Sequence, residues 1–234
     1  MDYESYWSGT HWLNVDQIEH SVLRRILPAT GYRVVDIGCG YGRLADCYMD
    51  RFEHAVLLDS SASLLSQAAE RTGRCGARVV ADLHRLPFRD GSFDTGLMVR
   101  VFHHVEDPGG CLREVNRVLT SNGQFVLNYR NKRDVLSMIR WLSRRRTYNP
   151  FKKDPVEASL MVTAHHPGFI DQAMREAGFR IVRSAGTTGA LVRLAAGKGP
   201  ARLALALSVR ASPLFGGAKL TSWLFCLARK GDSK

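Results

Sequence analysis

The sequence VVDIGCGYGR occupies residues 34–43 and joins the end of a predicted strand to a glycine-rich turn. Two β-branched valines lead into it, as they do in a buried strand, and Asp36 stands near the strand's end. Glycine then recurs at every second position from Gly38 to Gly42, so the backbone can turn sharply and approach a ligand closely. The spacing of the apolar residues that follow predicts a helix over residues 44–51. In a parallel sheet this turn lies at the carboxyl edge, where nucleotide-like ligands bind.

The glycine spacing by itself suits a dinucleotide, a phosphate or only a tight bend. In the dinucleotide pattern G-x-G-x-x-G the third glycine stands one residue later than Gly42 does here. Asp36 would also face the negative charge of a pyrophosphate, whereas an acid at that place suits a cationic α-amino group. The stretch therefore favours a ligand that joins an amino acid to a nucleoside, and S-adenosylmethionine fits that description.

Two further strands are predicted to end in an acid, over residues 54–59 and 77–82. Asp59 follows the glycines by about twenty residues, where nucleoside-binding α/β folds place a carboxylate that accepts both ribose hydroxyls. An acid there can instead cap the next helix, but the serines at 60, 61 and 63 offer that cap and leave Asp59 free. We assign Asp36 to the amino group, Asp59 to the ribose and Asp82 to the exocyclic amine of an adenine.

Composition indicates one large α/β domain in a reducing cytoplasm. The chain has 234 residues, of which 45% are hydrophobic and 24% charged. No apolar run is long enough for a membrane-spanning helix, and the polar, acidic first residues do not resemble a signal peptide. The five cysteines are dispersed without a C-x-x-C spacing, which predicts free thiols and neither a zinc site nor a disulfide framework.

The net charge of +11 is concentrated in the second half. Residues 140–153 contain six basic residues and no acid, and no acid lies between Glu176 and Asp232. Such an excess can meet nucleic acid, anionic lipid headgroups or an acidic substrate, or it can be only a solvated surface.

Several longer motifs resemble the class I S-adenosylmethionine-dependent methyltransferases, and specifically their small-molecule, quinone-biosynthesis-like group. They are VVDIGCGYGRLA, LLDSS, ADLHRLPFRDGSFD, VFHHVEDPGGCLREVNRVL, SNGQFVLN and FIDQAMREAGF, in the order expected over roughly residues 30–185. The resemblance implies an α/β, Rossmann-like, doubly wound sheet of seven strands, order 3-2-1-4-5-7-6, with strand seven antiparallel. Residues 179–183 are then strand six and residues 222–228 strand seven.

The resemblance also implies S-adenosyl-L-methionine as cofactor, with S-adenosyl-L-homocysteine as its product. The residues it places around the cofactor are Asp36, Gly38, Cys39, Gly40 and Gly42 for the methionine part, Asp59 with Ser60 for the ribose, Asp82 with the Leu83 amide for the adenine, and Arg100 and Val101 beside the methionine end.

Histidines supply the candidates for a general base, which methyl transfer needs only when the acceptor must first lose a proton. His104 and His103 follow the fourth strand, and His165 lies in a later loop expected to overhang the same edge. Each can instead cap a loop or pack in the core. No metal site is expected, because adjacent histidines are expected to point apart.

We expect residues 1–234 to form a single domain in which three segments add to the minimal fold. The sequence of residues 1–30 predicts an aromatic segment followed by a helix. Either the helix simply packs on the sheet, or the aromatic segment before it closes over the ligand as a lid. Residues 133–166 and 188–218 are insertions on the substrate side, and the second is either a packed helix or a basic, apolar flap that touches a membrane or a lipophilic acceptor.

Three functions are weighed on the sequence, and methylation of a protein also remains open. The favoured one is methylation of a small molecule, lipophilic or aromatic, by an enzyme that can also contact membranes through its basic half. A tRNA or RNA methyltransferase is the second, weakened because the arginine run lacks interleaved aromatic residues for base stacking. A cofactor-binding partner protein without enzymatic activity is the third.

Overall fold

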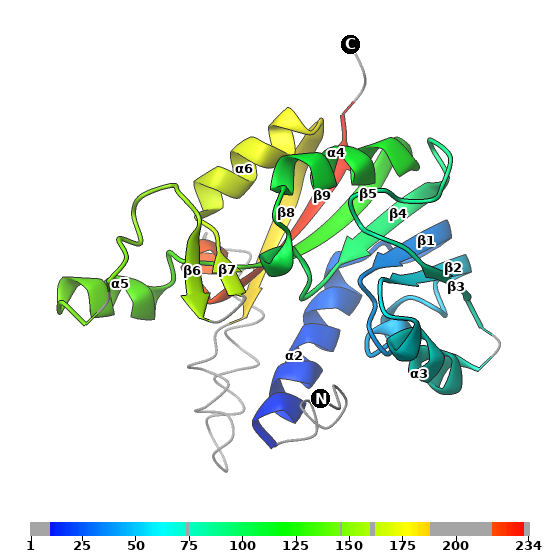
Figure 1. The fold of residues 1–234 in the computed structure, drawn as a ribbon, viewed down its shortest axis with the longest axis horizontal. Helices are drawn as coiled ribbons and strands as arrows, with labels where there is room; N and C mark the ends of the chain where they lie inside the picture. The colour runs from blue at the N-terminus through cyan, green and yellow to red at the C-terminus, as the bar shows by residue number, and fades with distance from the viewer. Residues whose placement is uncertain (1–9, 74, 146, 160–161, 188–216, 232–234) are drawn as a thin grey trace.

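A computed structural model describes residues 10–73, 75–145, 147–159, 162–187 and 217–231. Its centre is a seven-stranded sheet of order β3-β2-β1-β4-β5-β9-β8, in which β9 runs antiparallel between β5 and β8 (Figure 1). With β8 and β9 as the sixth and seventh strands, this is the predicted order, and the predicted fold class is confirmed.

The sheet strands are β1 (Gly31–Ile37), β2 (Phe52–Asp59), β3 (Ala77–Val80), β4 (Phe93–Met98), β5 (Leu119–Arg130), β8 (Phe179–Thr187) and β9 (Trp223–Lys230). The helices are α2 (Thr10–Ile26), α3 (Ala62–Thr72), α4 (Pro108–Val118), α5 (Val135–Leu142) and α6 (Pro167–Glu176).

Helices cover both faces of the sheet, so β1 and β4 are buried on both sides. The α4 and α6 helices share one core cluster with the sheet through residues such as Leu112 and Ile170. On the other face, α2 packs a cluster that includes Val22 and Tyr48 (Figure 1). This layering leaves the carboxyl ends of the parallel strands open at one edge.

The predicted helix over residues 44–51 is wrong. The segment is a series of turns with one short 3₁₀ helix, η1 (Ala45–Cys47). The amides of Ala45, Cys47 and Tyr48 each bond to the carbonyl three residues back, which closes tight turns instead of an α-helix. The tight path brings Tyr48 beneath the end of β1, where its side chain is fully buried.

The first insertion contains two elements. Its helix, α5, was predicted, whereas a small hairpin of β6 (Val156–Ser159) and β7 (Val162–Ala164) was not. The aromatic segment before α2 and almost all of the 188–218 insertion lie outside the described residues, so both lid hypotheses stay predictions. Among the helices that the structure describes, none is long and apolar enough to span a bilayer.

Candidate active site

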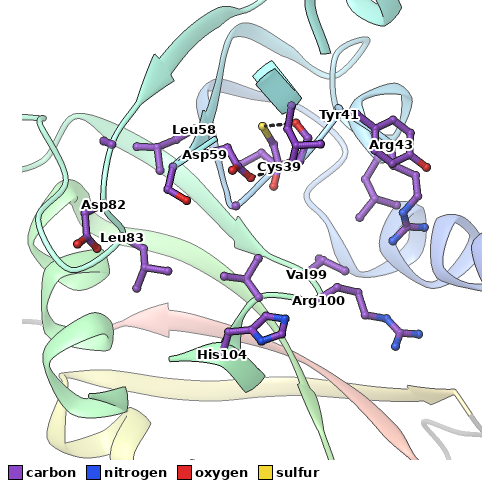
Figure 2. A pocket seen from close by; sticks show the side chains of 18 of the residues that line it. Cys39, Tyr41, Arg43, Leu58, Asp59, Asp82, Leu83, Val99, Arg100 and His104 are labelled. Atoms are coloured by element: carbon purple, nitrogen blue, oxygen red, sulfur yellow. Dashed lines mark hydrogen bonds between the residues drawn. The ribbon is translucent and has the colours of Figure 1, made fainter. Parts of the chain in front are cut away.

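A cavity of about 440 Å³ opens at the carboxyl edge of the sheet, beside the glycine turn and the ends of β2 and β4 (Figure 2). Its volume falls in the range of small-ligand sites. All the predicted cofactor residues except Gly42 line it: Asp36, Gly38, Cys39, Gly40, Asp59, Ser60, Asp82, Leu83, Arg100 and Val101. Gly42 faces α3 instead, since a Cβ there would lie 3.3 Å from the Cβ of Ala68.

The glycine turn is fastened to the end of β2. The amides of Gly38 and Cys39 donate to the carbonyl of Leu58, at 2.7 and 3.0 Å, and the Gly40 amide donates to Asp59 at 2.8 Å. Gly38 has a φ of 75°, and a Cβ on it would stand 2.3 Å from Val101. Because these three amides are already used inside the protein, they do not form the free N–H cradle that a pyrophosphate requires.

Asp59 holds two loops as well as facing the cavity. Its Oδ2 accepts the Gly40 amide, and its Oδ1 accepts the Ser61 amide at 2.9 Å. Ser61 caps α3 as predicted, because its hydroxyl accepts the Leu64 amide. The expectation that this cap leaves Asp59 free is nevertheless wrong. A carboxylate has about four acceptor positions, so two remain for a pair of ligand hydroxyls.

The three strand-end acids share one cavity, in the order of their strands. Since β3, β2 and β1 are neighbours in the sheet, Asp82, Asp59 and Asp36 follow one another along its edge. Figure 2 shows Asp82 and Leu83 at one end of the cavity and Arg43 at the other. Asp82 is exposed, and its Oδ1 accepts the His84 amide at 2.8 Å.

Asp36 is the buried member of this row. The hydroxyl of Tyr48 donates to its Oδ2 at 2.9 Å. Burial raises the pKa of Asp36 to about 7, although the Tyr48 hydrogen bond and the charge of Arg43 act in the opposite direction. A cation bound beside this poorly solvated carboxylate would stabilise its charged form. The arrangement therefore suits an ammonium group.

An ion cluster that sequence reasoning missed joins α2 to the cavity. Glu19, fully buried, accepts hydrogen bonds from Arg43 at 2.8 Å and from Arg100 at 2.7 Å. Burial alone would raise the pKa of Glu19, but the charges of Arg100 and Arg43 outweigh it and lower that pKa. The signal was available, because Glu19 stands on the helical face of Val15 and Val22, where a carboxylate needs a buried partner.

Arg100, predicted to lie beside the methionine end, lines the cavity and extends its guanidinium toward α2 and β9. Its guanidinium lies over the ring of Trp223, 3.6 Å from the centroid, while it bonds Glu19. The residue has a φ of 63°, in the left-handed region that is rare outside glycine. Because that conformation turns the chain at the end of β4, Arg100 and Val101 line the cavity together.

The candidate histidines occupy different environments. His104 lines the cavity and is exposed, whereas His103 and His165 are buried and do not belong to its lining. Burial lowers the pKa of His103 to about 3 and that of His165 to about 4. The rings of His103 and His104 lie against each other, tilted by 48° with centroids 3.9 Å apart, so the expectation that they point apart is wrong.

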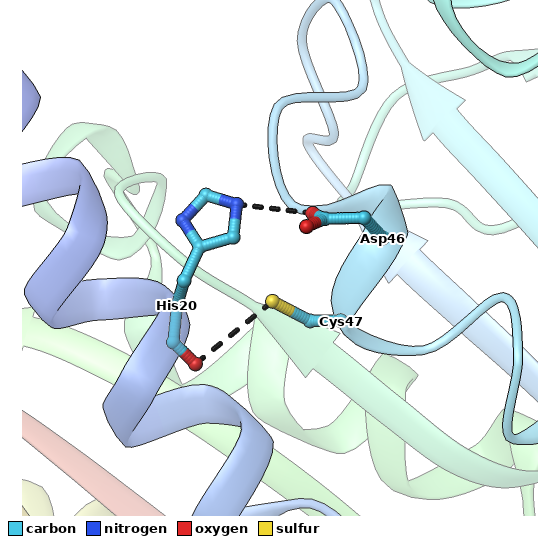
Figure 3. A group of neighbouring side chains, drawn as sticks. All are labelled: His20, Asp46 and Cys47. Carbon is cyan, nitrogen blue, oxygen red and sulfur yellow. Dashed lines mark hydrogen bonds and ion pairs between the residues drawn. The ribbon is translucent and has the colours of Figure 1, made fainter.

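A second cluster, His20 with Asp46 and Cys47, fastens α2 to η1 (Figure 3). His20 Nδ1 lies 2.8 Å from the Asp16 carbonyl, and Nε2 lies 3.0 Å from Asp46 Oδ1. Both ring nitrogens therefore lie against oxygen atoms of the protein. Arg24 also donates to Asp46 at 3.0 Å. The positive charge of the Arg24 guanidinium beside Asp46 disfavours a metal ion in this cluster.

Comparison with known proteins matches residues 35–127 to the protein family described as "Methyltransferase domain". A demethylmenaquinone methyltransferase of Thermotoga maritima is 34% identical over 108 residues, which cover 45% of this chain and 47% of the relative. A malonyl-[acyl-carrier protein] O-methyltransferase of Geobacter sulfurreducens is 30% identical over 163 residues, 61% of each protein. The chain therefore spans less than two thirds of the length of either relative.

Solved structures show the same fold over nearly the whole chain. A methyltransferase of Thermotoga maritima superposes with a TM-score of 0.66, covering 97% of this chain and 94% of its own, at 20% sequence identity. At that identity the likeness establishes the fold alone.

Proposed function

The chain belongs to the class I S-adenosylmethionine-dependent methyltransferase family, and on that basis we propose that it transfers the methyl group of S-adenosylmethionine to a small-molecule acceptor. The observation that carries the proposal is the row of Asp82, Asp59 and Asp36 on one cavity, beside a glycine turn whose amides are already used. That row offers acceptors for a base, a sugar and an amine in sequence along one edge.

The residues present fit this cofactor. The charged form of Asp36 would hold the α-ammonium group. Because this carboxylate is poorly solvated, a bound cation would stabilise its charge. The two unused acceptor positions of Asp59 suit a pair of ribose hydroxyls, and Asp82 with the Leu83 amide suits an adenine edge. When bound, the cofactor supplies a methyl group already activated on a sulfonium.

The chain's own part in the reaction is to position the reactants and exclude water. Much of the rate of an in-line methyl transfer comes from holding donor and nucleophile collinear in a dry site. Of the three candidate histidines, His104 alone lines the cavity with an exposed ring. It is therefore the residue we assign to accept a proton, where the acceptor carries one on its nucleophilic atom.

A small-molecule acceptor is supported by the names of the relatives, demethylmenaquinone methyltransferase and malonyl-[acyl-carrier protein] O-methyltransferase. The test is incubation of the protein with methyl-labelled donor and fractions of a cell extract, followed by separation of small molecules, lipids, RNA and protein. We expect the label in the small-molecule or lipid pool. Label in RNA or protein would contradict the acceptor class. No transfer to any pool, with donor binding intact, would favour the non-enzymatic alternative.

A further inference from the structure

We propose that α5 and the loop after it form a docking surface for an anionic membrane. This surface, which we term the α5 patch, comprises five exposed apolar residues and five exposed basic residues between positions 135 and 153. The apolar members are Val135, Leu136, Ile139, Leu142 and Phe151. The basic members are Arg140, Arg144, Arg145, Lys152 and Lys153. The proposal concerns where the protein acts and does not rest on methyl transfer.

The helix buries a polar residue and leaves most of its apolar side chains exposed, unlike an ordinary surface helix. Its one buried residue is Ser137. By contrast, Leu142 is 69% exposed and Ile139 is 55% exposed. Isolated exposed apolar residues are ordinary, but this many on so short a helix form a patch of the kind that marks a contact surface.

Polar contacts hold this inverted helix in place. The Asp134 carboxylate accepts both the amide and the hydroxyl of Ser137, at 3.1 and 2.7 Å. The Ser137 hydroxyl lies 3.1 Å from the Tyr148 hydroxyl, and Lys132 donates to the Asp154 carbonyl at 2.6 Å. These bonds tie the start of α5 to the loop after it and join the two flanks of the patch to each other. The patch is thus preformed, and docking it requires little ordering.

The charge of the patch selects an anionic partner. Residues 135–153 contain no acidic side chain. Of the nearest two acids, Asp134 is buried in the Ser137 contacts, and Asp154 stands at the edge after the two lysines. A hollow of about 400 Å³ lies between Leu136, Ile139 and the basic side chains of Arg140 and Arg145. Apolar walls beside two guanidinium groups suit a phosphate headgroup with its acyl chains.

The aromatic residues of the patch fit a bilayer better than a nucleic acid. Trp141 and Phe151 pack edge to face, with centroids 5.6 Å apart, so they face each other and do not form separate platforms for bases. An aromatic pair at the rim of an apolar patch, flanked by arginine and lysine, matches the composition of membrane-interface segments. Figure 1 shows α5 at the periphery of the molecule, away from the sheet.

Co-sedimentation with vesicles tests the proposal. We expect binding to phosphatidylcholine vesicles that contain phosphatidylglycerol, little binding to phosphatidylcholine alone, and weaker binding at high salt. Arg144→Gln with Arg145→Gln should reduce the binding by about 30-fold, from the usual contribution of two basic residues at such a surface. Ile139→Ser with Leu142→Ser should reduce it by at least about tenfold.

Matched variants away from the patch serve as controls. Val182→Ser removes a comparably exposed apolar side chain from β8, and Arg113→Gln with Arg175→Gln removes two exposed arginines from α4 and α6. Both controls should sediment as the wild type does, and every variant should keep wild-type affinity for the donor in solution. Retained donor binding separates failure of this inference from failure of the proposed function.

Three outcomes would overturn the inference. One is no binding to the anionic vesicles, or equal loss in patch and control variants. The second is binding of the patch to tRNA with no binding to vesicles, measured by fluorescence anisotropy on the same proteins. The third is a dimer in solution that the Ile139→Ser, Leu142→Ser variant disrupts while vesicle binding is absent, which would assign the patch to a second copy of the chain.

Discussion

The hydroxyl of Tyr48 donates a hydrogen bond to Asp36 across a distance of 2.9 Å, and neither side chain has appreciable contact with solvent. The bond couples the floor of the cavity to the turn that carries η1. It also stabilises the charged form of a carboxylate whose pKa burial raises to about 7.

Donor affinity should therefore depend on pH near neutrality. Since the ammonium group needs a charged Asp36, we expect the affinity to fall by up to about tenfold for each pH unit below 7 and to level off above it. Tyr48→Phe removes the hydrogen bond and should move this transition to higher pH. Calorimetric titration with S-adenosylhomocysteine between pH 6 and about 9 measures both curves. Identical curves for the two proteins would contradict the coupling.

Asp36→Asn should stabilise the protein while it weakens donor binding. The folded state keeps a proton on Asp36 that the unfolded state has already lost, so wild-type stability falls as pH rises from 3.8 to about 7. The amide removes this cost. We expect a melting temperature several degrees above wild type at pH 8 and no difference near pH 4. A lower melting temperature at pH 8 would show that the carboxylate is not costly.

Asp59→Asn should lower donor affinity by about 10- to 100-fold, because one charged acceptor toward the ribose is lost. Asp94→Asn is the matched control. Asp94 also accepts two backbone amides, those of Tyr32 and Arg33 at 2.8 and 2.7 Å, but it lies outside the cavity. Both variants should lose similar stability in urea, and only Asp59→Asn should lose affinity. Equal losses of affinity would reduce Asp59 to a loop-holding role.

Glu19→Gln should destabilise the fold by about 3–5 kcal/mol at pH 7, because Arg43 and Arg100 lose their buried counter-charge. Glu70→Gln, at an exposed position of α3, should change stability by less than about 0.5 kcal/mol. Since the folded pKa of Glu19 is lowered, its stabilisation is present above 4.5 and is lost as pH falls through the folded value. The difference in the free energy of unfolding between variant and wild type should therefore become smaller in acid, and urea unfolding at several pH values measures it.

Variants of His104 and His103 should have different effects, the first on turnover and the second on the pH dependence of stability. His104→Gln should reduce turnover by at least about 100-fold with an acceptor that must lose a proton, with little change in stability. His103→Phe should instead flatten the pH dependence of stability. Its folded pKa is lowered to about 3, so the wild type loses stability as pH falls from 6.5. A turnover loss in His103→Phe, without one in His104→Gln, would reverse the assignment.

The positions of the three acids could be predicted because they depend on local pattern and simple topology. An apolar run that leads to Asp36, Asp59 or Asp82 indicates a strand end, and parallel strands bring their ends to one edge. The role of the glycines at 38 and 40 could also be predicted, because a turn with repeated left-handed residues requires glycine. The sheet order came from the family resemblance and is confirmed.

Only the tertiary structure decided which side chains meet across the fold. Glu19 lies 24 residues from Arg43 and 81 from Arg100. The hydrophobic periodicity of the sequence cannot predict contacts between residues so far apart in the chain. The same holds for Tyr48 beneath Asp36 and for the outward apolar face of α5. Periodicity shows that a helix has two faces. It does not show which one the protein covers, because that depends on contacts such as those of Ser137 with Asp134 and with Tyr148 in the loop that folds back after α5.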